Sequence, residues 1–260
     1  LCAKTGYDPT DFDASTLATA VADCDSVVLM SYATDGAAII EELAIEEWED
    51  FDYQPSFNIA PTQITPILLG KNNSRMIKPM QWGLIPSWSK NKTIGSKMIN
   101  ARSETLLEKP SFQNLVNQHR CIVISDGYFE WKRENDGKQP FYIFHSDKKL
   151  LPMAGLWTSW KSSDKSIVNS FTVITTTPQP NIAHIHHRMP VILNPISIDE
   201  WIHCDETSSN QALTNLVPLN KPLSFYPVST LINSPRNNSS ECIRSVQDSS
   251  TIDLFLKIQK

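Results

Sequence analysis

Apolar runs rich in branched and aromatic residues recur along the chain from Asn58 onward, and Pro, Asn and Gly separate them. Short runs of this kind, bounded by turn-forming residues, are typical of β-strands. The pattern predicts strands over Ile64–Leu69, Met76–Trp82, Cys121–Ser125, Pro140–His145, Met153–Trp157, Phe171–Thr175, Val191–Leu193 and Leu223–Val228. We therefore expect a protein built mainly from strands.

Helical periodicity is confined to three places. Longer helices are predicted over Ser103–Asn117 and Ile198–Val217, and a short amphipathic helix between Ile40 and Trp48, where apolar residues recur at helical spacing. The regular strand–helix alternation of a doubly wound parallel sheet is absent. The prediction is an α+β fold around a curved, mostly antiparallel sheet.

The charge is distributed unevenly. Residues 1–60 contain thirteen acidic residues and one basic residue, Lys4, whereas residues 61–260 contain 22 basic and 15 acidic residues, a net charge of +7. A positive body suits a polyanionic ligand, although the same surplus is common in proteins without one. We expect one domain over residues 1–232, with a divergent acidic segment over 8–52, and a loop or tail over 233–260.

The five cysteines, at positions 2, 24, 121, 204 and 242, are odd in number and widely spaced. This excludes a disulfide framework and a paired-cysteine metal or redox site, and it indicates a reducing compartment. No apolar run approaches the ~18–20 residues that span a bilayer, and the N-terminus lacks a secretory signal pattern. We expect an intracellular protein, nuclear in a eukaryote and otherwise cytoplasmic.

Two polar segments interrupt apolar surroundings. In the first, Asn100 and Arg102 would share one face of a strand and grip an anion together. The alternative is a helix N-terminus capped by Ser103 or Thr105. In the second segment, burial of Glu130 would raise the pKa of its carboxyl group toward neutrality and suit it to acid–base catalysis, unless it points outward from its strand.

Three histidines lie within four residues, at His184, His186 and His187. Because no Cys, Asp or Glu accompanies them, a single functional histidine is favoured over a metal site, and we predict neither metal nor cofactor. Trp82 and Trp88 bracket a Gly- and Pro-containing loop that suits stacking on unpaired bases, although such a pair is more often simply packed.

Together these motifs resemble the SRAP family, the SOS-response-associated peptidases, which shield abasic sites in single-stranded DNA. The resemblance covers about residues 56–232, in one order along the chain. Its motifs are Phe57–Thr62, Trp82–Trp88, Ile99–Thr105, Asp126–Trp131, Ile185–Pro190 and Pro227–Ser229. It implies a single compact, barrel-like α+β domain with a cationic groove for single-stranded DNA. We also expect the protein to act away from membranes and as a monomer.

The resemblance also implies a catalytic cysteine, Cys2, that becomes the first residue. Its amine would condense with the aldehyde of a ring-opened abasic sugar, and its thiol would close a thiazolidine, a covalent DNA–protein crosslink. Autopeptidase and lyase-like activities are implied as well. Glu130 would shuttle protons, His186 would assist ring opening, and Asn100 and Arg102 would position the sugar and its phosphates. Further DNA contacts are assigned to Asn58, Trp82, Trp88, Lys109 and Arg188.

The start of the chain departs from the family pattern, because Leu1-Cys2-Ala3-Lys4 stands where members read Met-Cys-Gly-Arg. While Leu1 remains attached, the amine of Cys2 is part of a peptide bond and no thiazolidine can form. Three alternatives stay open: a sequence lacking its true start, an active Cys2 exposed by self-cleavage, and an inactive homologue.

Two rival functions remain. A reversible reader of single-stranded or modified DNA would keep the groove without the nucleophile, and a peptidase acting on other proteins would use Cys2 with His186 or Glu130. Residues 249–256 also resemble the sliding-clamp-binding box of replication proteins, in which Ile252, Phe255 and Leu256 would enter an apolar pocket. The alternative for this segment is an amphipathic turn that packs on its own domain.

Overall fold

The computed structural model describes residues 29–32, 36–49, 51–135 and 137–246. Cys2 and Cys24, residues 8–28 of the acidic segment, and the residues assigned to clamp binding (Ile252, Phe255 and Leu256) lie outside this part of the chain. None of the helices within it has the length and apolar character needed to cross a bilayer.

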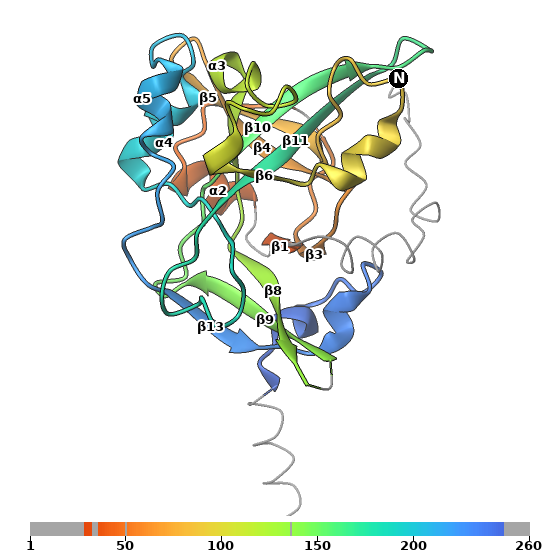
Figure 1. Cartoon of the computed structure of the whole chain (residues 1–260), viewed down its shortest axis with the longest axis vertical. Coiled ribbons are helices and arrows are strands. Elements are labelled where there is room, and N and C mark those ends of the chain that lie inside the picture. Colours follow the sequence, from red (N-terminus) through yellow and green to blue (C-terminus); the bar gives the residue numbers. More distant parts are fainter. Residues whose placement is uncertain (1–28, 33–35, 50, 136, 247–260) are drawn as a thin grey trace, which may run out of the picture.

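Five strands form a closed barrel (Figure 1). They are β4 (Ile64–Lys71), β5 (Ser74–Trp82), β7 (Arg120–Val123), β10 (Met153–Lys161) and β11 (Ile167–Thr176). Neighbours pair antiparallel in the order β11-β10-β7-β4-β5. The circle closes where β11 runs parallel to β5, at Ser170–Gln81 and Phe171–Trp82. The predicted α+β class, with a curved, mostly antiparallel and barrel-like sheet, is confirmed.

A second, antiparallel sheet lies below the barrel in the view of Figure 1. Its strands, in spatial order, are β13 (Leu223–Pro227), β9 (Gly137–His145), β8 (Gly127–Glu134), β1 (Leu29–Tyr32) and β3 (Ser56–Ile59). Three short strands extend the barrel sheet, namely β2 (Glu47–Trp48), β6 (Asn100–Arg102) and β12 (Met189–Pro190). β6 runs parallel to β11, and β12 pairs with the end of the same strand.

The helices in the described part of the chain are short. They are α2 (Gly36–Glu42), α3 (Leu115–Gln118), α4 (Pro195–Ile202) and α5 (Ser209–Leu213), with 3-10 turns η2 (Lys92–Lys97), η3 (Ser103–Thr105), η4 (Thr230–Asn233) and η5 (Ser240–Ile243).

Both longer helix predictions are corrected. The helix expected over Ser103–Asn117 is divided into η3, turns and α3, because Pro110 lacks an N–H and disfavours helical geometry in the residue before it. The helix expected over Ile198–Val217 is two helices. The first begins earlier, where the Asn194 side chain accepts from the N–H of the third helical residue, and the second begins after the cap Ser208.

The strand predicted over Val191–Leu193 is also wrong. The N–H of Val191 donates to Ile174 on β11, whereas its carbonyl accepts from Ala154 on β10. The segment therefore crosses between two strands and shares only an isolated bridge, Met153–Ile192, with one of them.

The acidic segment contributes to the core. The short helix predicted between Ile40 and Trp48 lies earlier in the chain: α2 covers Gly36–Glu42, its Ile39 is fully buried, and Leu43 just beyond its end is 4% exposed. The helix ends there because Ala44 adopts a positive φ of 47°. Trp48 belongs to β2 instead, and its ring stacks on Phe51.

The segment after residue 232 is held against the domain as far as Ser245, where the sequence predicted a loop or tail. Asn238 accepts from the N–H of Phe57, Cys242 is fully buried, and Ser245 forms a bridge with Val228. Packing therefore continues across the boundary expected at residues 232–233.

Candidate active site

Glu130 lies near the middle of β8 and is 2% exposed. The five residues from Gly127 to Trp131 are all buried, so both faces of this end of the strand are covered. An outward-pointing Glu130 is thereby excluded. Burial raises the pKa of the Glu130 carboxyl well above its usual range, and a hydrogen bond from the backbone N–H of Trp131 offsets this only in part. The protonated form is therefore favoured.

His186 faces this carboxyl group from the loop between β11 and β12. Its Nδ1 atom lies 3.5 Å from Oε1 of Glu130, and its side chain is 16% exposed. The same Nδ1 lies 3.2 Å from the backbone nitrogen of Arg188 and 3.3 Å from its carbonyl oxygen. Nδ1 therefore has a partner whether or not it carries a proton, which suits a group that exchanges a proton with Glu130.

Tyr128 was not identified from the sequence. It lies two residues before Glu130 on β8, so both side chains are on the same side of the strand. Burial, and second to it the charge that Glu130 carries when ionised, raises the pKa of the Tyr128 hydroxyl well above its usual range. The Tyr128 hydroxyl has no hydrogen-bond partner among the described residues. The sequence could have indicated Tyr128, because it lies two residues from the catalytic candidate Glu130 on a strand.

Arg188 is engaged within the protein rather than free for phosphate. Its guanidinium forms two hydrogen bonds with the Glu104 carboxylate, of 2.9 and 2.8 Å, and donates to the carbonyl oxygen of Thr175 at 2.6 Å. The pair joins the His186 loop to η3, directly after Asn100 and Arg102. We therefore assign Arg188 a positioning role in place of the DNA contact expected from the sequence.

Replacing Glu104 by Gln is expected to lower the free energy of unfolding by about 1 kcal/mol at pH 7, a modest value because the Glu104 side chain is 48% exposed. The hydrogen bond from Arg188 lowers the pKa of Glu104, so the stabilisation is present above the unfolded-state pKa. It is lost as the pH falls through the folded-state pKa. Urea denaturation should show that the difference in free energy of unfolding between the wild type and the variant is smaller at pH 3 than at pH 7. Glu108→Gln, at an exposed neighbouring residue, is the control. An equal difference in stability at both pH values would show that the ion pair with Arg188 is not its cause.

Asn100 and Arg102 share one face of β6, as the strand interpretation predicted. Ala101 between them is buried, whereas Arg102 is exposed and Asn100 is half-buried. The 3-10 turn η3 follows at once, but its N-cap residue is Arg102, whose side chain makes no capping hydrogen bond, so neither Ser103 nor Thr105 caps it. Because β6 and β12 both pair with β11 at Thr175, the Asn100–Arg102 strand and the His186 loop lie on either side of one strand.

Trp82 is in the core. It is fully buried, and its ring nitrogen donates to the carbonyl oxygen of Ile99 at 3.0 Å. Gly83 follows with a positive φ of 111°, and a Cβ there would lie 2.5 Å from the carbonyl oxygen of Gly95. The stacking role expected for Trp82 is therefore corrected: its ring cannot reach a base, and it holds the residue just before Asn100.

Asn58 is likewise internal, against its expected contact with DNA. It is 1% exposed, and its amide nitrogen lies 3.0–3.2 Å from the carbonyl oxygens of Ile232, Ser234 and Asn237. It therefore fastens the C-terminal loop to β3.

Two further candidates remain at the surface. Trp88 is 63% exposed, on a loop held by a hydrogen bond from the ring nitrogen of Trp160 to the carbonyl oxygen of Ser89. Lys109 is exposed in the turns after η3. Within the described ranges, no group of three or more His, Cys, Asp or Glu side chains is placed to hold a metal ion.

The fold is a closed α+β barrel in which a buried carboxyl group and a histidine lie close together, near the short strand that carries Asn100 and Arg102. A model of one family, SRAP (SOS response associated peptidase), matches residues 28–235, and the chain belongs to this family.

Several relatives are similar over most of the chain. The abasic site processing protein YoqW of Bacillus subtilis is 38% identical over 225 residues, covering 85% of this chain and 99% of its own. The abasic site processing protein HMCES of Xenopus tropicalis is 34% identical over 234 residues, covering 76% and 69%. A crystal structure of a Bacteroides thetaiotaomicron protein has a TM-score of 0.75 and 25% identity, covering 84% of this chain and 99% of that chain.

Proposed function

We propose that this protein processes abasic sites in single-stranded DNA, and that it captures them covalently through Cys2 once that residue is the first of the chain. The observation that carries the proposal is the buried Glu130 carboxyl, whose Oε1 lies 3.5 Å from Nδ1 of His186. An acid and a base at this separation can act together in proton transfer. The names of the relatives, which are abasic site processing proteins, support DNA with abasic sites as the substrate.

The chemistry requires protons at two stages. Condensation of the Cys2 amine with the sugar aldehyde forms a carbinolamine, whose hydroxyl group must be protonated to leave as water, and this gives the protonated imine. The thiol then loses its proton, and its sulfur attacks the imine carbon to close the ring. A buried carboxyl group whose pKa is raised, such as that of Glu130, can supply the first proton and accept the second.

Autopeptidase activity is part of the proposal, because the Cys2 amine is free only when Cys2 is the first residue of the chain. The raised pKa of Glu130 supports its role as a proton donor and acceptor in this cleavage too. An intracellular location also remains part of the proposal, supported by the spacing of the cysteines.

The proposal is tested by incubating the protein with single-stranded DNA that contains one abasic site. A shifted band that survives heating in denaturant is expected with this DNA and not with the same strand lacking the abasic site. The intact mass of the protein reports whether Cys2 has become the first residue. Binding that is entirely reversible and salt-sensitive would instead favour the reader function, and turnover of an added peptide would favour the peptidase.

Trp88 is proposed to stack on an unpaired base. Trp88→Ala is expected to weaken binding of intact single-stranded DNA by about 1–3 kcal/mol, because the exposed indole face is lost. Trp88→Phe should restore most of the affinity. Fluorescence anisotropy with a labelled oligonucleotide measures both, with Ile196→Ala, another exposed apolar side chain, as the control. An unchanged affinity in Trp88→Ala would remove Trp88 from the DNA surface.

A further inference from the structure

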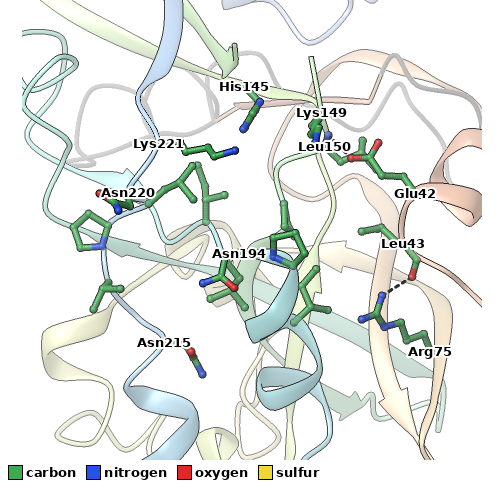
Figure 2. A pocket seen from close by; sticks show the side chains of 18 residues that line it. Glu42, Leu43, Arg75, His145, Lys149, Leu150, Asn194, Asn215, Asn220 and Lys221 are labelled. Carbon is green, nitrogen blue, oxygen red and sulfur yellow. Dashed lines mark hydrogen bonds between the residues drawn. The ribbon is translucent and has the colours of Figure 1, made fainter. Parts of the chain in front are cut away.

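A cavity of about 740 Å³ shares no lining residue with the site of Glu130 and His186 (Figure 2). Its walls come from the end of α2, the end of β9 with the turn that follows, the start of α4, and the loop over residues 215–221. This volume lies within the range of sites that enclose small organic ligands.

Polar contacts hold the walls in place. The buried amide of Gln179 donates to the carbonyl oxygens of Leu219 and Lys221, and it accepts from the N–H of Leu223. On the opposite side, Arg75 donates to Leu43 and to Asp199, which ties α2 to the barrel and to α4. A site whose walls are fixed before a ligand arrives loses less entropy on binding.

The interior is largely apolar. Leu43, Leu150, Leu193 and Ile198 line it and are each at most 5% exposed, so they form a continuous floor with the core. Val217, at the rim, is 57% exposed. This lining favours a ligand with an apolar body.

The charged side chains of the lining are positive in surplus, with Lys149, Lys221 and Arg75 against Glu42. In Figure 2, Lys221 extends toward His145, and Lys149 lies across the opening from it. Neither lysine forms an ion pair with any of the described residues, and Nδ1 of His145 accepts from the N–H of Asp147, which leaves Nε2 to donate. The one carboxylate in the lining, Glu42, accepts from the N–H of Leu150 at 3.0 Å.

The geometry points to a second binding site, for a small organic anion whose apolar body enters the cavity and whose charged group lies between Lys149 and Lys221. The apolar floor accounts for the body of the ligand, and the two lysines account for its charge. The site is separate from abasic-site processing and does not depend on it.

Two matched fluorescent probes test the site. 1-Anilinonaphthalene-8-sulfonate carries one negative charge, and N-phenyl-1-naphthylamine has the same rings without the sulfonate. The sulfonate is expected to bind with one-to-one stoichiometry and more tightly than the neutral probe. The double variant Lys149→Glu with Lys221→Glu should lower the affinity for the sulfonate at least tenfold and leave the affinity for the neutral probe nearly unchanged.

Two further variants locate the binding. Lys161→Glu with Lys165→Glu makes the same charge change on exposed residues outside the cavity and should have no effect. Val217→Trp should narrow the opening of the cavity and lower the affinity for both probes. Because Val217 is exposed, the substitution should leave the packing of the core unchanged. The inference is overturned if neither probe binds, if the neutral probe binds as tightly as the sulfonate, or if binding is indifferent to both the lysine and the Val217 variants.

Discussion

Glu130→Gln is expected to slow the formation of the heat-stable crosslink with abasic single-stranded DNA by about 10²–10⁴-fold. The amide keeps the shape of the side chain but neither releases nor accepts a proton in the relevant range. Single-turnover crosslinking, followed by denaturing gel electrophoresis across pH 5–9, measures the effect. The wild-type rate should depend on pH, and the residual rate of the variant should not follow the same profile.

The same substitution is expected to stabilise the fold at neutral and alkaline pH. Because burial raises the pKa of Glu130, the native state holds its proton more tightly than the unfolded state does. The stabilisation is complete below the unfolded-state pKa and is lost as the pH rises through the folded-state pKa, by about 1.4 kcal/mol per pH unit between the two. The Gln variant has no proton to lose, so its free energy of unfolding does not fall in this way. Its stability relative to the wild type therefore increases between the unfolded-state and the folded-state pKa of Glu130.

Glu134→Gln is the matched control for both measurements. Glu134 lies at the exposed end of the same strand, where its carboxylate forms a surface ion pair with Lys132. Its replacement should leave the crosslinking rate and the pH dependence of stability unchanged. A Glu130→Gln protein that crosslinks at the wild-type rate would exclude Glu130 from the chemistry, whatever its stability.

Cys2→Ala is expected to abolish the heat-stable crosslink entirely. Three chains separate the roles of the amine and the thiol: one that begins at Cys2, one of the same length in which alanine replaces this first cysteine, and one in which Leu1 is retained by blocking cleavage. The first should give a crosslink that survives heating. The second should give only an imine, which borohydride reduction traps and heating hydrolyses. The third should give neither, because its Cys2 amine is in a peptide bond.

Cys24→Ala is the control, since it removes another thiol from the same N-terminal region. Its crosslinking should equal that of the wild type. A heat-stable band from the chain that begins with alanine would show that another nucleophile captures the sugar, and the role proposed for Cys2 would be abandoned.

The sequence predicted several strands of the barrel well because they are covered on both faces and therefore read as nearly uninterrupted apolar runs. Every residue of β7 is buried, and so is β11 from Ser170 to Thr176. The helices were predicted less well. The spacing of apolar residues does not reveal that Pro110 interrupts one helix or that Ser208 begins a new one. Local geometry at these residues outweighs the spacing of apolar positions.

Among the candidate site residues, what the sequence could supply was side-chain chemistry. Glu130 between two aromatic residues pointed to a buried carboxyl group, and Asn100 and Arg102 pointed to one polar face of a strand. Burial of Trp82 and Asn58 could not be predicted, because their partners, Ile99 and the loop over residues 232–237, depend on how distant segments pack.

The order of motifs along the chain, the strand-rich composition and the choice of an acid, a histidine and an Asn–Arg pair were all determined by the sequence by itself. Tertiary structure alone decided that Nδ1 of His186 meets Glu130 and that Arg188 pairs with Glu104, 84 residues away. The physical reason is that a side chain's role depends on its solvent exposure and on its nearest charge. Both are set by long-range packing, which local patterns of residues do not encode.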